Sequence, residues 1–493
     1  MKPIGDRAMS YGINRFVISS SDHQPFVDDH HKPGMTLGYS GQNITRNNTW
    51  ADETVAFDSY LARSSYLLQQ GQFVGDLAYF YGEGVPATIF FWKPLNPALP
   101  DGYEADWVNA DVILNRISVR DGRFVLPSGM SYRVLVIPDY VTQITLPLLR
   151  KLRDLVASGG IVIAAKPTGS PSLADQGKDV EYRNIVVQLW GIMDGASGNE
   201  HAYGKGKIYW GKPIEEVLAA ELTPPDFEHN KPEVDTDIVW IHRRDGDRDI
   251  YFVANQKDRP EDVQASFRVV GKEAEIWHPD TGLTEPAEYK IENGRTSVPL
   301  HLDPCGALFV VFRHPASVLS RTLPRRVVAD LATLEGPWQV RFPPNWGAPP
   351  QVRFDKLVSW TNNSNDGVKY FSGTATYSKD FVAPQSWFRP GAKVLLDLGA
   401  VKEIAEVSVN GRAVGGILWK PPFRADVTSA FKSGVNHLEV KITNLWPNRI
   451  IGDEQPNAKK RYAWLDYRPF KANAPLLESG MLGPVEVLSE LNQ

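Results

Sequence analysis

The chain has 493 residues, with 53 lysines and arginines against 58 aspartates and glutamates, and a formal net charge of −5. That length is well past the size at which one hydrophobic core stops growing, so three or four domains are expected. Charges of both signs are mixed along the chain, which provides neither a basic footprint for nucleic acid nor a cationic face for a membrane. The composition therefore favours a neutral partner.

Cys305 is the single cysteine, which excludes an internal disulfide, and no Cys/His cluster suggests structural zinc. The first residues, MKPIGDRAMSYGINRF, lack the apolar core of a signal peptide, and no run approaches eighteen consecutive apolar residues. As written, the sequence predicts a soluble chain without a targeting segment.

Residues 1–71 show the order strand, long loop and helix. An apolar β-like run, Phe16–Ile18, is followed by a polar, aromatic and glycine-rich loop. Apolar side chains then recur at helical spacing from Phe57 to Leu68, and Gly71 stands where a helix commonly ends. This is the repeating unit of a βα-barrel, so we interpret residues 1–71 as a C-terminal fragment of a (β/α)8 barrel.

Residues 72–212 are predicted to form an α/β domain. Four short runs of β-branched and aromatic residues between turn residues are expected strands: Val74–Tyr81, Asp111–Leu114, Val134–Pro138 and Ile161–Ala165. Leu146–Ser158 is an expected amphipathic helix that ends at Gly159. Strands that alternate with helices indicate a parallel sheet.

Beyond residue 213 helical periodicity disappears, and the rest of the chain is predicted to be all-β. Short alternating runs within 213–315 favour a small β-sandwich, in which Asp245-Gly246 forms a hairpin turn. The segment 316–335 is an expected linker, because the stretch from His314 to Arg326 that leads into it carries prolines and arginines. Residues 336–493 contain several further alternating strands, such as TATYSKDFVA and HLEVKITNLW, and indicate a jelly-roll sandwich.

Tryptophan is the first candidate for ligand contact, because aromatic faces stack on sugar rings. Seven of the fourteen tryptophans lie in the last third of the chain: Trp338, Trp346, Trp360, Trp387, Trp419, Trp446 and Trp464. Most are expected to fill the sandwich core. Trp419 and Trp446 are the better substrate-binding candidates, because each stands beside proline and polar residues at a strand end.

The N-terminal loop is the second candidate. Asp22, His23 and Gln24 follow the expected strand directly, which in a βα-barrel is the rim that carries active sites. The same loop then offers side chains suited to an array of sugar hydroxyls: Tyr39, Arg46, Asn47, Asn48 and Trp50. A loop that caps the barrel, with His23 hydrogen-bonded internally, is the equally weighted alternative.

Glycoside hydrolysis requires two carboxyl groups that flank the scissile bond. The carboxylates near the rim are Asp22, Asp28, Asp29, Asp52 and Glu53. Asp52 and Glu53 open the expected helix, where they meet its positive end, so a structural role is favoured for them over catalysis. No GxSxG, Walker A, HExxH or strand-linked GxGxxG pattern supports another reaction class.

Three N-terminal runs together resemble family 106 glycoside hydrolases, the bacterial α-L-rhamnosidases: GDRAMSYGINRFVISSSDHQPF, KPGMTLGYSGQNITRNNTW and SYLARSSYLLQQGQFVGDLAYFYGEGVP. A C-terminal run is similar to the galactose-binding-like sandwich that this family shares with family 2 glycosidases: VKEIAEVSVNGRAVGGILWKPPFRADVTSAFKSGVNHLEVKITNLWPNRIIGD. The resemblance covers essentially the whole chain.

The resemblance implies a (β/α)8 barrel, an amidotransferase-like α/β domain and β-sandwiches. It also implies an enzyme that inverts the configuration of the sugar, with two catalytic glutamates and a calcium ion near the site. Neither family glutamate can be placed on this sequence, so no catalytic residue is assigned. His23, Gln24, Arg46 and Trp50 match the family's late-barrel loop and are carried over as substrate-pocket candidates. For a full-length member the resemblance implies a periplasmic or secreted location.

The length of the chain bears on whether it contains a complete barrel. A complete barrel needs about 250 residues, or roughly 30 per βα unit, so only about two units fit before residue 72. The sequence is therefore interpreted as a fragment, a split gene product or a mis-called start. We expect the C-terminal part of an inverting α-L-rhamnosidase that acts on rhamnose-containing glycans and is inactive without an upstream barrel polypeptide. A non-catalytic carbohydrate-binding protein or a structural set of ancillary domains is the alternative.

Overall fold

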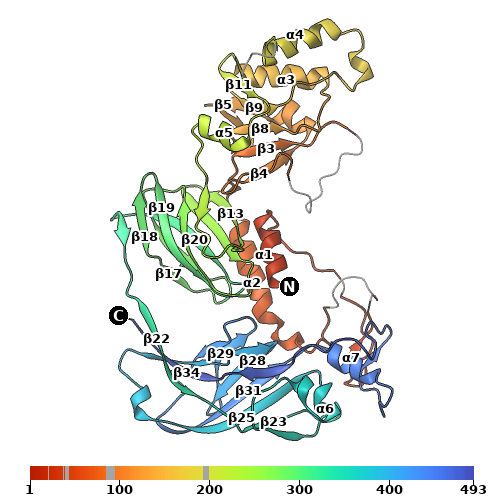
Figure 1. Ribbon diagram of the computed structural model, residues 1–493, viewed down its shortest axis with the longest axis vertical. Helices are drawn as coiled ribbons and strands as arrows, with labels where there is room; N and C mark the ends of the chain where they lie inside the picture. The colour runs from red at the N-terminus through yellow and green to blue at the C-terminus, as the bar shows by residue number, and fades with distance from the viewer. Residues whose placement is uncertain (20, 37, 39–43, 85–94, 193–198, 493) are drawn as a thin grey trace.

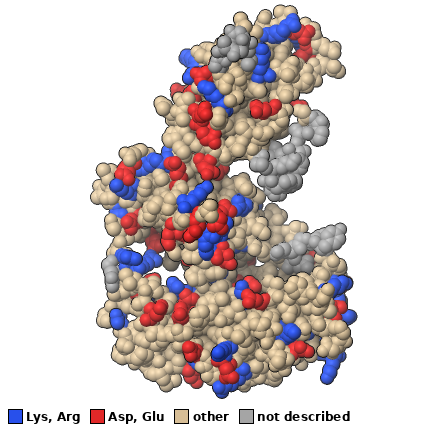
Figure 2. All heavy atoms as spheres, in the orientation of Figure 1, with Lys and Arg blue, Asp and Glu red and all other residues tan. Residues whose placement is uncertain are grey.

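The computed structural model describes residues 1–19, 21–36, 38, 44–84, 95–192 and 199–492. Three bodies follow one another along its long axis: a parallel sheet with helices, a β-sandwich carrying the N-terminal helices, and a larger β-sandwich (Figure 1). Acidic and basic side chains are intermixed over the displayed face of all three (Figure 2).

The N-terminal segment contains two helices, α1 (Lys2–Ser10) and α2 (Thr54–Leu68). The second confirms the helix predicted from Phe57 to Leu68, whereas α1 was not predicted. A 3-10 turn, η1 (Ala51–Glu53), leads into α2, and the two-residue strand β1 (Pro33–Gly34) pairs in parallel with β32 (Trp464–Leu465). The predicted strand at Phe16–Ile18 is wrong, because these residues are extended without a pairing partner and Val17 is 91% exposed. A parallel strand needs neighbours for its backbone groups, and none of the described residues provides them.

The first body is a six-stranded sheet in the order β10-β11-β9-β8-β3-β4, parallel except for the pair β10-β11. Its strands are β3 (Leu77–Phe80), β4 (Ala105–Val108), β8 (Val134–Ile137), β9 (Ile161–Ala164), β10 (Glu200–Tyr203) and β11 (Gly206–Tyr209). Helices α3 (Leu146–Ala157) and α4 (Asp179–Trp190) share one core with the sheet, and α5 (Ile214–Ala220) belongs to the core on its other face. A small meander completes this body: β5 (Ser118–Arg120), β6 (Arg123–Val125) and β7 (Ser131–Tyr132).

Two predictions for this region are wrong. Asp111–Leu114 is not a strand: Val112–Arg116 forms the helical turn η2, because the Asn109 side chain accepts a hydrogen bond from the Val112 backbone N–H at 2.8 Å. Helical structure also continues past residue 213, because Ile214, Val217 and Leu218 of α5 pack against the parallel sheet. The parallel sheet itself, three of its strands and the helix α3 are confirmed.

The second body is a sandwich of two antiparallel sheets, in the orders β12-β15-β19-β18-β21 and β17-β16-β20-β14-β13-β2. The first sheet contains β12 (Phe227–His229), β15 (Glu261–Phe267), β18 (Tyr289–Glu292), β19 (Arg295–Leu302) and β21 (Ser320–Arg321). The second contains β2 (Gln72–Phe73), β13 (Ile238–Asp245), β14 (Arg248–Asn255), β16 (Lys272–Trp277), β17 (Thr284–Pro286) and β20 (Ala307–Pro315). The predicted hairpin is confirmed, since β13 pairs with β14 around Gly246, whose φ of +62° suits glycine.

The third body is a larger sandwich, with sheets in the orders β22-β34-β26-β30 and β24-β23-β25-β31-β28-β29. The first sheet contains β22 (Arg326–Thr333), β26 (Lys393–Asp397), β30 (Arg424–Asp426) and β34 (Glu486–Asn492). The second contains β23 (Trp338–Arg341), β24 (Gln351–Phe354), β25 (Thr374–Ala383), β28 (Ile404–Val409), β29 (Arg412–Leu418) and β31 (Gly434–Thr443). Smaller elements are η4 (Trp360–Asn362), α6 (Asp366–Lys369), η5 (Gln385–Trp387), β27 (Ala400–Lys402), α7 (Pro447–Asp453) and β33 (Gly480–Gly483).

The expected linker needs a correction within 316–335. Residues 326–333 are the strand β22, which pairs antiparallel with β34 and thereby belongs to the third body. Pro324 and the arginines beside it suggest a linker, but the pairing partner that makes residues 326–333 a strand lies some 160 residues away in the sequence. Trp338, Trp360 and Trp387 are buried in the core of the same sandwich, as expected for most tryptophans of this region.

A buried polar network joins the first two bodies. His242 on β13 is fully buried between two carboxylates, with Nδ1 2.7 Å from Asp226 Oδ2 and Nε2 3.1 Å from Asp249 Oδ1. Arg268 donates to Oδ2 of Asp76, the residue that precedes β3, at 2.8 Å. Burial alone would lower the pKa of His242, but the two carboxylates outweigh it and raise that pKa above its ordinary value.

Replacing this histidine tests the network. We expect His242→Gln to lower the free energy of unfolding by about 1–3 kcal/mol, because it removes a charged hydrogen-bond partner from two buried carboxylates. The loss is partial, since Asp249 keeps Arg244 and Lys272 as partners. Asp226 keeps Arg268. Since the folded pKa of His242 is raised, its stabilisation is fully present below pH of about 6.5 and is lost as the pH rises through the folded pKa. The difference from wild type in urea unfolding should therefore shrink between pH 6 and pH 9.

The matched control is His301→Gln, since His301 is exposed and lies 2.7 Å from the exposed Asp262 carboxylate. Exposed ion pairs contribute little, so this variant should unfold like wild type. Equal losses for the two variants, or a His242 effect that grows with pH, would contradict the network's role.

Candidate functional site

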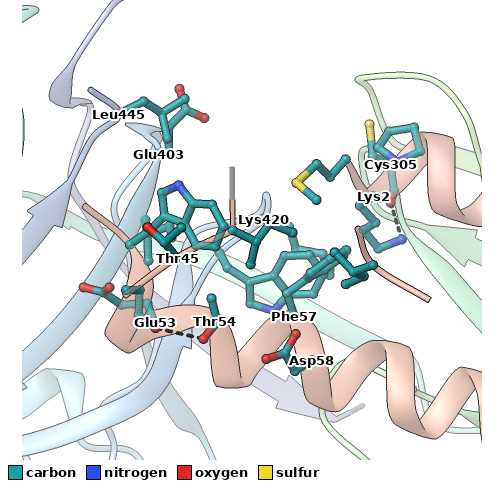
Figure 3. A pocket seen from close by; sticks show the side chains of 18 of the residues that line it. Lys2, Thr45, Glu53, Thr54, Phe57, Asp58, Cys305, Glu403, Lys420 and Leu445 are labelled. Carbon is teal, nitrogen blue, oxygen red and sulfur yellow. Dashed lines mark hydrogen bonds between the residues drawn. The ribbon is translucent and has the colours of Figure 1, made fainter. Parts of the chain in front are cut away.

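We call the second body the first sandwich and the third body the second, or C-terminal, sandwich. A cavity of about 780 Å³ lies where the N-terminal segment and these two sandwiches meet. We call it the interdomain cavity. Thr54, Phe57 and Asp58 reach it from the first turns of α2, while Glu403, Lys420 and Leu445 come from the C-terminal sandwich (Figure 3). Residues from opposite ends of the chain therefore share one site.

Aromatic rings form one wall of the interdomain cavity. Trp419 follows β29 and is half-buried, with its ring centroid 5.5 Å from that of Phe57 and 5.6 Å from that of Tyr60 on α2. Trp50 lines the same cavity one residue before η1. These contacts hold Trp419 against α2 at a fixed position, which is what a stacking platform requires.

Burial raises the pKa of two carboxyl groups in the cavity. Glu53 is 8% exposed, its Oε1 accepts a hydrogen bond from Thr443 Oγ1 at 3.0 Å, and burial raises the pKa of its carboxyl. Its Oε2 is shielded from solvent without a partner among the described residues. Desolvation also raises the pKa of Glu403, whose side chain still reaches solvent. A protonated carboxyl can both donate and accept, as a hydroxylated ligand demands.

The lysines that line the cavity are neutralised by partners behind the wall. Lys2 Nζ lies 2.6 Å from Asp6 Oδ2 and donates to the Cys305 carbonyl at 2.7 Å, a contact drawn in Figure 3. Lys420 Nζ lies 3.1 Å from Asp280 Oδ2 and 3.3 Å from Asp303 Oδ2. This side of the cavity therefore offers no net positive charge from lysine.

The structure brings together three of the six residues predicted from sequence as substrate contacts, since Arg46, Trp50 and Trp419 all line the interdomain cavity. Arg46 also braces its own loop, because its guanidinium donates to the carbonyls of Gln24 at 2.6 Å and Phe26 at 2.9 Å. Arg46 and Trp50, which were predicted together on one loop, thus share the cavity with Trp419, which lies more than 350 residues away in the sequence.

The other three candidates lie elsewhere. Gln24 has a structural contact, donating to the Met35 carbonyl at 2.7 Å and accepting from the Met35 backbone N–H at 3.0 Å. His23 is exposed and is not among the residues that line the interdomain cavity. Trp446 lines a second cavity of about 160 Å³, and its Nε1 donates to the Asn47 carbonyl at 2.9 Å. Tyr39 lies outside the described residues.

Sequence reasoning missed Phe57, Glu403 and Lys420 as cavity residues. Phe57 was assigned to the apolar face of a helix, which it also serves. Lys420 stands next to Trp419 in the run WKPPF, so adjacency to a predicted contact was the available signal. Glu403 had no such sequence signal, because nothing local distinguishes it from other glutamates at strand edges.

No group of three or more His, Cys, Asp or Glu side chains in the described parts of the chain is arranged to hold a metal ion. These residues therefore do not fit the calcium ion that the family resemblance implies, and no chemical step is derived through it. Among the same residues, no helix combines the length and apolar character needed to cross a membrane.

Comparison with known proteins now identifies the class. A family model described as alpha-L-rhamnosidase, glycoside hydrolase family 106, matches residues 1–291, and the chain belongs to this family. The structure of a rhamnosidase from Novosphingobium sp. PP1Y is 37% identical and superposes with a TM-score of 0.88, covering 99% of this chain and 46% of that one. A protein of Formosa agariphila named a putative beta-glucuronidase is 27% identical over 737 aligned positions, covering 99% of this chain and 61% of that protein.

The chain thus spans less than half the length of the solved rhamnosidase. It is similar to that enzyme over nearly its whole length, in sequence as well as in fold. Membership of the rhamnosidase family and a mixed α/β architecture with several antiparallel sheets follow directly from these matches.

The contact between Glu53 and Thr443 can be tested by removing the hydroxyl. We expect Thr443→Val to lower the free energy of unfolding by about 1–3 kcal/mol at pH 8, because it leaves a second buried oxygen of Glu53 without a donor. The folded pKa of Glu53 is raised, so the stability that this group contributes is present below its unfolded pKa, about 4.3, and is lost as the pH rises through the folded value.

The cost of Thr443→Val should consequently be smaller at pH 4 than at pH 8, as measured by urea unfolding at both values. Thr376→Val on the neighbouring strand β25 is the control for loss of a strand hydroxyl. A pH-independent cost, or the same cost in both variants, would show that the hydroxyl does not support Glu53.

Proposed function

We propose that this chain is the sugar-binding, non-catalytic part of an inverting α-L-rhamnosidase that acts on rhamnose-containing glycans. The observation that carries the proposal is the interdomain cavity itself. In a chain of the rhamnosidase family, it joins the predicted contacts Arg46, Trp50 and Trp419 to carboxyls with raised pKa.

The chemistry of the wall suits a neutral deoxy sugar. The apolar face and methyl group of rhamnose match Trp50 and Trp419, and its hydroxyls match carboxyl groups as hydrogen-bond partners. Three carboxyl groups line the cavity, from Glu53, Asp58 and Glu403, while its two lysines are ion-paired. Arg46 is a further side-chain cation of the lining, and its guanidinium donates to backbone carbonyls. Three carboxyl groups still outnumber it, which disfavours a uronic acid because its carboxylate would meet like charge.

The catalytic pair is proposed to lie outside these residues. An inverting glycosidase needs an acid and a base that flank the scissile bond, with both carboxyls free to exchange protons. Of the cavity carboxyls, Glu53 already accepts from Thr443 and holds the start of α2 to the second sandwich. The family's barrel glutamate motif has no counterpart in this sequence.

The finer fold assignments belong to the same proposal. Residues 72–212 would be the amidotransferase-like domain, 213–315 the small sandwich and 336–493 the galactose-binding-like sandwich, with 1–71 the end of a (β/α)8 barrel. Because α5 packs on the parallel sheet, the end of the amidotransferase-like domain is better placed at about 220 than at 212. Because β22 pairs with β34, the start of the last sandwich is better placed at 326 than at 336.

Calorimetry with methyl α-L-rhamnoside tests sugar binding. We expect a millimolar affinity that Trp50→Ala lowers about tenfold through loss of stacking, and that Glu403→Gln preserves because the amide keeps a donor and an acceptor. Tyr140→Ala, an exposed aromatic on the parallel-sheet body, is the control and should bind like wild type. Methyl glucuronide should bind more weakly than the rhamnoside. Absence of heat at millimolar sugar, or tighter binding of the glucuronide, would contradict the proposal.

An assay with an aryl α-L-rhamnoside tests the missing chemistry. The purified chain should give no turnover above buffer. Turnover that disappears in Asp22→Asn or Glu53→Gln would overturn the claim that the catalytic acids are supplied from outside. Sugar binding without turnover is the result that separates this proposal from an autonomous hydrolase.

Exposed apolar side chains at the N-terminus support a barrel polypeptide as the partner. Ile4, Tyr11, Val17 and Val27 are all largely exposed, in a chain that spans 46% of the solved rhamnosidase. Both carboxylate oxygens of Asp22 are shielded without a partner among the described residues. Exposed apolar side chains can mark interaction sites, so we assign this segment to contact with the rest of a (β/α)8 barrel.

Affinity purification from the native cell followed by mass spectrometry tests the partner. A co-purifying polypeptide with a (β/α)8 barrel sequence is expected, and Val17→Asp should reduce its recovery because a charge would be buried in the contact. Val234→Asp, at a fully exposed position between β12 and β13, should not. If the chain is recovered alone, the freestanding carbohydrate-binding alternative is favoured.

A further inference from the structure

A separate, smaller groove lies beyond the interdomain cavity along helix α2. It has a volume of about 490 Å³ and is formed by the C-terminal half of α2 and the turn between β16 and β17. The residues that line it include Ala62, Arg63 and Tyr66 from the helix and Trp277 and Leu283 from the turn. We call it the α2 groove.

The interdomain cavity and the α2 groove are linked by an exposed stripe of the helix. Asp58, Ala62 and Tyr66 are exposed and stand at positions i, i+4 and i+8, which lie one above another on a helix. Asp58 lines the interdomain cavity, whereas Ala62 and Tyr66 line the α2 groove. Eight residues of helix span about 12 Å, a distance that a short oligosaccharide can bridge. Ala62 leaves room at the midpoint of this path.

A chain of contacts beneath the helix fixes the two sites relative to each other. Lys420 lines the interdomain cavity and its Nζ lies 3.1 Å from Asp280 Oδ2. The backbone carbonyls of Pro279 and Asp280 accept hydrogen bonds from Arg63 at 3.0 Å and 2.9 Å. The turn that walls the α2 groove is thus tied both to α2 and to the loop that carries Trp419. A ligand that spans both sites would meet a pre-formed surface.

The walls of the α2 groove have the character of a sugar subsite. Tyr66 and Leu283 are each 66% exposed, so their side chains present apolar surface to a ligand at the groove's edge. Trp277 is held in place, because its Nε1 donates to Glu275 Oε2 at 2.9 Å and the Arg313 guanidinium lies 5.0 Å from its ring. His278 Nε2 lies 3.0 Å from Glu285 Oε1, which anchors a polar group beside the rings.

We propose that the α2 groove is a distal subsite for the sugars that follow the terminal rhamnose in an oligosaccharide. The terminal residue occupies the interdomain cavity, the chain crosses the exposed stripe at Ala62, and a later ring stacks on Tyr66. The inference rests on the proposed function, because it needs a rhamnoside in the interdomain cavity. It adds that the ligand is an oligosaccharide and not a small aryl rhamnoside.

Calorimetry with two ligands tests the subsite: methyl α-L-rhamnoside and an α-L-rhamnosyl-terminated tetrasaccharide. The full chain should bind the tetrasaccharide more tightly. Tyr66→Ala should weaken the tetrasaccharide about three- to tenfold, the loss expected for one aromatic stacking contact, and leave the methyl rhamnoside unchanged. The variant should fold, because Tyr66 is exposed and alanine is the strongest helix former. Leu283→Ser on the opposite wall should act in the same direction, while Tyr140→Ala should change neither ligand.

The outcomes separate the two proposals. Equal affinity for both ligands, or a tetrasaccharide affinity unchanged in Tyr66→Ala and Leu283→Ser, overturns the subsite and leaves the proposed function standing. A tetrasaccharide affinity that falls in Tyr66→Ala but not in Trp50→Ala overturns the continuous path, because the groove would then bind independently. Failure of both ligands to bind overturns the proposed function and the subsite together.

Discussion

The packing of α1 and α2 on the outer face of the first sandwich determines where the rest of the site can form. Along β14, alternate side chains serve two cores: Tyr251 and Val253 point between the sheets, while Ile250 and Phe252 point toward the helices. A sheet that is apolar on both faces must be covered on both. The helices provide that cover, and in doing so they place the first turns of α2 opposite the second sandwich.

Polar contacts then fix the N-terminal segment in this position. Tyr60 on α2 donates to the buried Asp6 of α1, which is also paired with Lys2. At the other end of α2, Glu53 accepts from Thr443 of β31. Buried polar groups of this kind tolerate few alternative arrangements, because a small displacement leaves them without partners. The interdomain cavity is consequently bounded by elements that cannot shift independently.

Secondary structure was predictable wherever the local pattern determined it, and was not where a distant partner did. The helix α3, the strands β8 and β9 and the β13-β14 hairpin all carry their own periodicity or turn residues. The run Phe16–Ile18 has the composition of a strand but no neighbour to pair with, whereas β22 looks like a linker and finds its partner in β34. Pairing is a long-range property, so composition misleads in both directions.

The same distinction explains the site. Arg46 and Trp50 could be grouped from sequence because one loop carries both, and Trp419 could be singled out for its surroundings. That Trp419 packs against Phe57 depends on how the C-terminal sandwich meets α2, and no local signal encodes it. Gln24 shows that suitable chemistry does not make a site residue. Its side-chain amide could contact a sugar, but it is hydrogen-bonded to the Met35 backbone.

A division of labour between binding and chemistry follows from how the cavity is built. Its aromatic wall depends on contacts between α2 and the C-terminal sandwich, and both elements lie within this chain. Stacking and hydrogen bonding of a sugar require only that such a wall is rigid. Hydrolysis requires in addition two carboxyls placed on either side of one bond, and Glu53 is engaged in holding the wall together. The proposed function therefore separates recognition, which such a wall could supply, from catalysis, and the contact that fixes the wall also occupies Glu53.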